Sequence, residues 1–152
     1  MIAVAASACS GAALALACPP LGLVPLAWIA LAALAYLLGR DLHDPSRPRT
    51  RLQRAFEGGG RGLAFGMAAN MVGQRFVPDV VARFTPLPWA AGLVALALLG
   101  WAQGLVWWVV GAARARLVRA GIPPWCAFAL AVYAGTFVPS IFPWTPAGVA
   151  AT

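Results

Sequence analysis

Lysine is absent from this sequence of 152 residues, and acidic residues and histidine are scarce. All 11 basic residues are arginine, there are 4 acidic residues, and His43 is the single histidine. These 152 residues therefore hold no chemistry that depends on a lysine amine. Charged residues make up 10% of the sequence, whereas a soluble domain carries about 25%. Polar surface is too limited to cover a globule of this size, which excludes an ordinary soluble enzyme. The high hydrophobicity also excludes a disordered chain.

Cysteine is also sparse, and its arrangement indicates neither a metal site nor a disulfide framework. Cys9, Cys18 and Cys126 are an odd number, lie in apolar runs and form no CxxC or Cys/His cluster. We interpret them as small, buried hydrophobic side chains. The glycine-rich run 58–62 lacks the lysine and the preceding strand of a phosphate-binding loop. No catalytic residue, metal or cofactor is expected.

What the sequence does contain is typical of a polytopic membrane protein. Hydrophobic residues make up 62%, the mean hydropathy is +0.81, and there are 7 tryptophans. We expect a single all-α domain over residues 1–152, a transmembrane bundle of about five helices. The candidate spans are 2–18, 21–39, 62–81, 88–112 and 124–142.

The distribution of arginine predicts the orientation of this bundle. Loop 40–61 contains six arginines and the stretch 114–119 contains three, whereas the turns on the other side contain only Arg83. The positive-inside rule makes the arginine-rich side cytoplasmic, so the N-terminus is inside and the stretch 142–144 outside. The net charge of +7 then faces anionic lipid, and no nucleic-acid partner is expected.

Small residues recur every fourth position at the start of the third span. Gly58, Gly62, Gly66 and Asn70 share one helix face, and Gly100 and Gly104 make a GxxxG step in the fourth span. In lipid, such stripes let two helices approach closely. We expect these glycines to serve helix packing.

Polar side chains interrupt the third span near its end, where Asn70, Gln74 and Arg75 lie. Ionisable groups within a membrane are costly and rarely face lipid. Arg75 either lines a polar cavity and contacts a lipid phosphate, or it extends to the interface or pairs with Asp79 one turn away.

Three short motifs resemble those of a bacterial family, the apolipoprotein N-acyltransferases. The stretch 19–31, PPLGLVPLAWIAL, is similar to the family's opening where its first spans meet. The glycine-rich start of the span at 62–66 follows an arginine-containing loop, as in the family. Phe142, Pro143 and Trp144 resemble its FPW element, which lies just outside the membrane after a span. The order of the motifs and the topology agree.

The resemblance implies a place in lipoprotein biosynthesis at the bacterial inner membrane, as a multi-pass domain. The family transfers an acyl chain from phospholipid to the N-terminal diacylglyceryl-cysteine of lipoproteins, with a Glu–Lys–Cys triad in a nitrilase-like domain at the outer face. The resemblance covers the membrane part only. Without lysine, these 152 residues alone are expected to be catalytically incompetent. Family members often carry a Glu–x–x–Arg-like pair before FPW, and residues 135–140 here contain neither acid nor arginine.

Phospholipid is the expected partner, together with a lipoprotein substrate or a separately encoded nitrilase-like domain. The candidate lipid- or substrate-facing residues are Arg75, Gln74, Phe142, Pro143 and Trp144. The alternative is a small non-enzymatic membrane scaffold or accessory subunit. A transporter fragment is disfavoured, because no internal repeat is present and intramembrane charge is almost absent.

Overall fold

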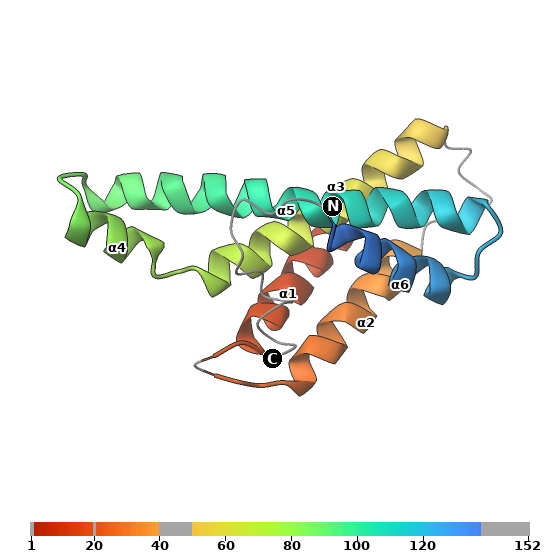
Figure 1. Cartoon of the computed structure of the whole chain (residues 1–152), viewed down its shortest axis with the longest axis horizontal. Coiled ribbons are helices and arrows are strands. Elements are labelled where there is room, and N and C mark those ends of the chain that lie inside the picture. The colour runs from red at the N-terminus through yellow and green to blue at the C-terminus, as the bar shows by residue number, and fades with distance from the viewer. Residues whose placement is uncertain (1, 20, 40–49, 138–152) are drawn as a thin grey trace.

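The computed structural model describes residues 2–19, 21–39 and 50–137, and within them it contains six α-helices (Figure 1). The helices are α1 (Ile2–Leu16), α2 (Pro25–Gly39), α3 (Arg51–Gly73), α4 (Val77–Phe84), α5 (Trp89–Arg119) and α6 (Pro124–Gly135). The all-α fold expected from the sequence is confirmed for these residues.

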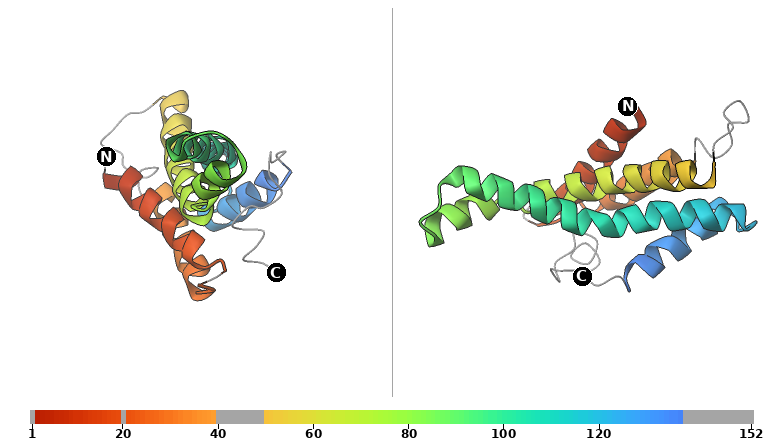
Figure 2. Two further views of the ribbon diagram at one scale, coloured as in Figure 1. Left: turned by 90° about the vertical axis from the view of Figure 1, so that its left-hand side faces the viewer. Right: turned by 90° about the horizontal axis from the view of Figure 1, so that it is seen from above.

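Helices α3 and α5 form the central pair of the fold and run side by side along its long axis (Figures 1 and 2). They are antiparallel, since Gly58 lies against Gly111 while Gly66 lies against Gly104. A Cβ added at Gly62 would overlap the backbone carbonyl oxygen of Trp107. The two backbones therefore approach as closely as small residues allow. In lipid, where apolar side chains gain nothing by leaving the solvent, such close packing is what holds two helices together.

Helices α1 and α2 form a hairpin that packs across α3. Gly22 adopts a φ of 59° in the connecting turn, a left-handed conformation that favours glycine. The Ser10 hydroxyl donates a hydrogen bond of 2.7 Å to the carbonyl oxygen of Ala30, which joins the two helices. At the crossing with α3, a Cβ on Gly11 would overlap the carbonyl oxygen of Phe65. The hairpin is therefore held by one buried hydrogen bond and by direct backbone contact.

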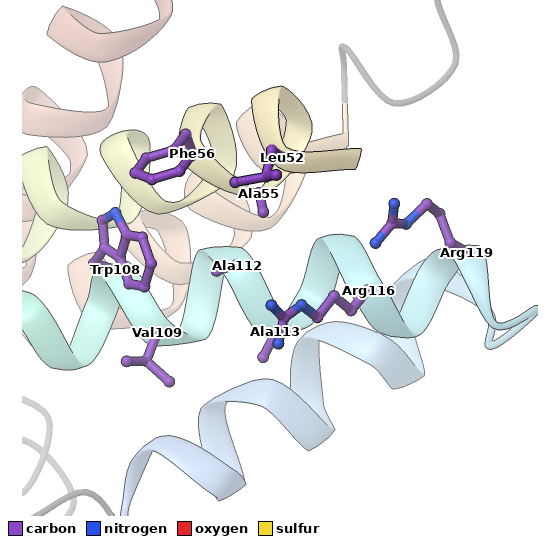
Figure 3. Close-up of a pocket in the computed structure, with 9 residues that line it drawn as sticks. All are labelled: Leu52, Ala55, Phe56, Trp108, Val109, Ala112, Ala113, Arg116 and Arg119. Atoms are coloured by element: carbon purple, nitrogen blue, oxygen red, sulfur yellow. The ribbon is translucent and has the colours of Figure 1, made fainter. Parts of the chain in front are cut away.

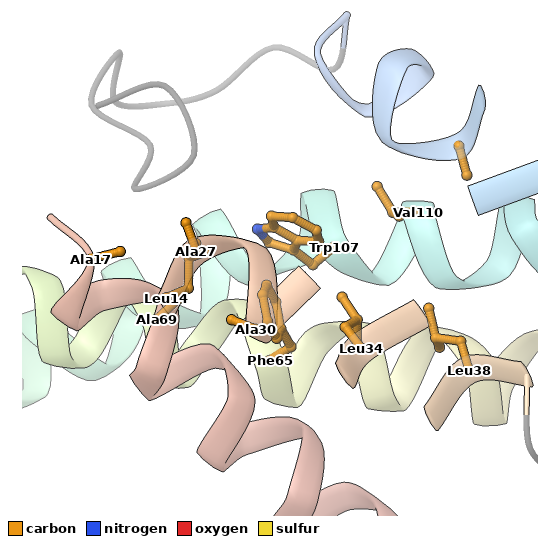
Figure 4. Packing of buried hydrophobic residues seen from close by; sticks show 11 residues of the cluster. Leu14, Ala17, Ala27, Ala30, Leu34, Leu38, Phe65, Ala69, Trp107 and Val110 are labelled. Carbon is orange, nitrogen blue, oxygen red and sulfur yellow. The ribbon is translucent and has the colours of Figure 1, made fainter. Parts of the chain in front are cut away.

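The core lies where these four helices meet (Figure 4). Phe65 of α3 is fully buried, and its ring packs edge-on against Trp107 of α5 with centroids 4.6 Å apart. Leu14 of α1 and Leu34 of α2 fill the same cluster. α6 packs on α5, with Gly135 against Val110.

The third predicted span differs from the structure at both of its ends. The helix begins at Arg51, within the stretch 40–61 that we expected to be a loop, with a short interfacial helix over 52–56 as the alternative. A capping box explains this start, because Thr50 and Gln53 exchange side-chain and backbone hydrogen bonds of 3.3 and 2.9 Å. The helix then ends at Gly73, so the stretch 62–81 is divided between α3 and α4.

Proline accounts for the division between α3 and α4. A proline inside a helix removes one donor, and its ring clashes with the carbonyl four residues earlier. For Pro78 that residue is Gln74, which is the C-cap of α3. Pro78 is tolerated in the first turn of α4, where its missing N–H costs little.

The two last spans also differ in length from the prediction. α5 continues past residue 112 to Arg119, so the three arginines expected in a loop lie on the helix. α6 ends at Gly135, and residues 138–142 of the fifth predicted span lie outside the described residues. Local hydropathy drops at Arg114, but residues 112–119 are mostly alanine, arginine and leucine, which favour a helix, and the helix ends shortly before Gly121 with its positive φ.

One described helix, α5, is long and apolar enough to cross a membrane, while α1, α2 and α6 are shorter apolar helices. With 31 residues, α5 is about 46 Å long, more than the roughly 30 Å of hydrocarbon in a bilayer. α1 and α2, of 15 residues each, reach only about 22 Å. Large apolar side chains such as Trp28 and Trp125 are exposed, a surface suited to lipid.

Candidate functional site

The break between α3 and α4 contains two of the residues singled out from the sequence. Gln74 is buried as the C-cap of α3, and its backbone N–H donates to the carbonyl oxygen of Asn70 at 2.8 Å. Arg75 and Phe76, which follow, are exposed. The interrupted helix thus places a cation and an aromatic ring at the surface beside a buried amide.

Gln74 belongs to a cluster of three buried amides between α3 and α5. Its Nε2 donates a hydrogen bond of 3.3 Å to Oε1 of Gln103, while Nδ2 of Asn70 donates to the carbonyl oxygen of Gly66 at 2.8 Å. Three polar atoms of the cluster have no partner: Asn70 Oδ1, Gln74 Oε1 and Gln103 Nε2. A buried polar atom without a partner costs about 1–3 kcal/mol, and the cluster can both donate to and accept from a polar group.

Gln103 was missed by the sequence reasoning, although a signal was present. It is the only side-chain amide between residues 88 and 112, in an otherwise apolar span. A lone amide in such a span needs a partner within the bundle. The antiparallel register of α3 and α5 supplies Gln74, which lies 29 residues away in the sequence.

The carboxylate of Asp79 forms a hydrogen bond with a side chain other than Arg75, the partner that we considered. Its Oδ1 accepts a hydrogen bond of 3.0 Å from the indole Nε1 of Trp89, which ties α4 to the start of α5. Pro78 packs against Gly92 at the same contact. Within the described residues Arg75 forms no ion pair with Asp79, so the exposed guanidinium of Arg75 is available to an outside anion.

The opposite end of the bundle gathers arginines around the C-terminus of α2. Nη1 of Arg61 donates a hydrogen bond of 2.7 Å to the carbonyl oxygen of Leu37. Arg114 is only 3% exposed and lies beside Gly39, and its Nε and Nη1 have no hydrogen-bond partner. Unsatisfied carbonyls and the negative end of the helix dipole both favour cations at this position.

The remaining expectations concern the chain end, the cysteines and metals. Phe142, Pro143 and Trp144 lie outside the residues that the structure describes.

Cys9 is exposed on α1, unlike the buried side chain we expected, while Cys18 and Cys126 are half-buried. The face of α1 that carries Cys9 is covered by neither α2 nor α3, the helices on which α1 packs. Among the described residues, no three His, Cys, Asp or Glu side chains are grouped to hold a metal ion.

Comparison with known families identifies the chain. The family model described as the apolipoprotein N-acyltransferase N-terminal domain matches residues 10–152. In a comparison with curated proteins, no protein matches the chain. The family match begins within α1, extends through all the later helices and includes the motifs at 19–31 and 142–144. The resemblance noted in the sequence is thereby confirmed, and the chain belongs to the apolipoprotein N-acyltransferase N-terminal domain family, whose members are membrane domains.

Proposed function

We propose that this chain is the multi-pass membrane domain of a bacterial inner-membrane N-acyltransferase and presents phospholipid to a catalytic domain at the outer face. The observation that carries the proposal is the family match over residues 10–152. The family's reaction takes an acyl chain from a phospholipid, so a membrane domain has to admit a two-tailed lipid and hold its headgroup near the interface.

The proposed orientation is the one predicted from arginine. Arg61 and Arg114 lie near the C-terminus of α2, and Arg116 and Arg119 lie in the last turn of α5. The positive-inside rule assigns that end to the cytoplasm. The α3–α4 break lies beside the middle of α5, where Gln74 meets Gln103, and α4 continues from it to the start of α5. We therefore assign the break to the outer half of the membrane.

At the outer face we assign headgroup recognition to Arg75 and Gln74. Arg75 is exposed, and a lipid phosphate is the anion that an outer-leaflet phospholipid offers to its guanidinium. Gln74, Gln103 and Asn70 each have one buried polar atom without a hydrogen-bond partner. These atoms could form hydrogen bonds with the ester and hydroxyl groups of a lipid. Phe142, Pro143 and Trp144, which lie outside the described residues, are assigned to contact with lipid or substrate.

A non-enzymatic scaffold or accessory subunit is the second candidate function. The family match covers the N-terminal membrane domain alone, so it agrees equally well with a role that involves no catalysis. The two proposals differ in one respect: only the first requires a nitrilase-like domain to work with this chain.

The test is acyl transfer by this chain together with a nitrilase-like domain, either fused after Thr152 or co-expressed. Phospholipid-dependent N-acylation of a diacylated lipopeptide is measured in proteoliposomes. Arg75→Gln is expected to raise KM for the phospholipid about fivefold with kcat unchanged, because a headgroup contact acts equally in the ground and transition states. Arg83→Gln removes the same charge from an exposed position on α4 and should leave KM unchanged.

Two results would contradict the proposal. Equal effects of Arg75→Gln and Arg83→Gln would show that the assignment to Arg75 is wrong. If no nitrilase-like domain becomes active with this chain, while the chain inserts and folds, the scaffold function is favoured instead.

A further inference from the structure

A groove lies at the arginine-rich end of the central pair, on the side of α5 away from the α1–α2 hairpin. Its volume is about 650 Å³, within the roughly 300–1,000 Å³ typical of small-molecule sites. Figure 3 shows it between the first turns of α3 and the C-terminal half of α5. The lining residues are Leu52, Ala55, Phe56, Trp108, Val109, Ala112, Ala113, Arg116 and Arg119.

The walls of the groove are apolar and open to the surroundings. Leu52 and Phe56 are 69% and 59% exposed, although each is a large hydrophobic side chain. The ring of Phe56 meets the indole of Trp108 edge-on, with centroids 6.0 Å apart. Two helices thus frame a mainly apolar groove that no other described segment lines.

The charge in the lining of the groove comes from the last turn of α5. Arg116 and Arg119 are exposed, lie in the last turn of α5 and make no ion pair among the described residues. In Figure 3 the guanidinium of Arg119 points back toward the groove. Both arginines follow the end of the predicted span at residue 112, the depth at which lipid phosphates lie.

We propose that this groove binds one anionic phospholipid of the cytoplasmic leaflet, with its phosphate on Arg116 and Arg119 and an acyl chain along Phe56 and Trp108. Charge complementarity selects this occupant. An apolar groove with two arginines in its lining fits an amphiphile that has one anionic end. Guanidinium groups bind phosphate through paired N–H donors. The site lies at the opposite end of α3 from the proposed acyl-donor site and has no part in acyl transfer.

The experiment uses the whole chain in bilayers containing phosphatidylglycerol that carries a photoactivatable diazirine on one acyl chain. After irradiation, labelled peptides are mapped by mass spectrometry, and unlabelled phosphatidylglycerol or phosphatidylcholine is added as competitor. Labelling is expected to concentrate around Phe56 and Trp108. Unlabelled phosphatidylglycerol should reduce this labelling far more than the same amount of phosphatidylcholine. Even labelling over all exposed apolar faces, including Trp28, would overturn the proposal.

Substitutions separate this site from general charge attraction. Arg119→Gln should weaken lipid binding about fivefold and the Arg116→Gln/Arg119→Gln double variant roughly 25-fold. Arg54→Gln removes one charge from the same end of the molecule without lining the groove, and should change nothing. Equal losses in Arg54→Gln and Arg119→Gln would overturn the proposal.

A variant of the wall tests the acyl chain independently of charge. Ala55→Leu narrows the groove and keeps every arginine, so labelling at Trp108 should fall while the protein stays folded, as judged by size-exclusion chromatography. A dimer in size-exclusion chromatography that Ala55→Leu abolishes would show that a second copy of the chain occupies the groove, and would also contradict the proposal. Because the readout is lipid labelling, its failure leaves the acyl-transfer proposal untouched.

Discussion

The guanidinium of Arg61 donates a hydrogen bond of 2.7 Å to the backbone carbonyl of Leu37, and this bond ties α3 to the last turn of α2. Arg61 is 9% exposed, so the bond is sheltered from competing water. An arginine that marks the cytoplasmic side in the sequence thus also caps a neighbouring helix. A charge counted by the positive-inside rule can therefore be a structural element of the bundle.

Arg61→Met tests this cap. The substitution keeps most of the aliphatic stem but leaves the carbonyl of Leu37 without its donor, so the free energy of unfolding should fall by about 1–3 kcal/mol. Thermal unfolding in detergent measures the change, with Arg54→Met on the same helix as the control. An equal melting temperature for wild type and Arg61→Met would show that the bond is not needed.

Gly62→Ala tests the close approach of α3 and α5. The new Cβ would overlap the carbonyl oxygen of Trp107, and backbone cannot move aside as a flexible side chain can. We expect a loss of about 1–3 kcal/mol, the usual cost of overpacking. Gly60→Ala is the matched control, since nothing lies within 4 Å of a Cβ there. It should be neutral or stabilise by up to about 1 kcal/mol. Equal effects of the two variants would contradict the register.

Gln103→Leu tests whether the amide cluster binds a ligand or only joins helices. If it only joins helices, the change should cost about 0.6 kcal/mol of stability and leave acyl transfer with a catalytic partner unchanged. Our proposal instead expects KM for phospholipid to rise in this variant by more than the loss of stability explains. Unchanged kinetics would remove Gln103 from the proposed site.

Topology can be measured with reporter fusions after Arg49 and after Thr152. The arginine count predicts that they report opposite sides of the membrane, the first cytoplasmic and the second outside. The same side for both fusions would show that the number of crossings is even rather than odd after Arg49.

The purified 152-residue polypeptide is expected to transfer no acyl group, because it contains no lysine for the family's triad. Phospholipid-dependent acylation of a diacylated lipopeptide by this polypeptide, with contaminating enzyme excluded, would contradict the expectation.

Composition and short motifs were enough to predict the class of protein. An apolar chain with little charge favours helices in lipid, because each helix satisfies its own backbone groups. The stretch 19–31 predicted the family correctly. The stripe Gly58, Gly62 and Gly66 predicted a helix-packing face, since small residues at fourfold spacing share one side of a helix wherever the helix lies.

Tertiary structure alone decided the partners of the buried polar side chains. Arg114, which hydropathy placed in a loop, lies on α5 and is buried beside Gly39, a contact that depends on a helix distant in sequence. The pairing of Gln74 with Gln103 and the groove at Phe56 and Trp108 likewise arise from the antiparallel register of α3 and α5. Periodicity reports which face a residue occupies, whereas the residue it meets depends on how two distant helices are aligned.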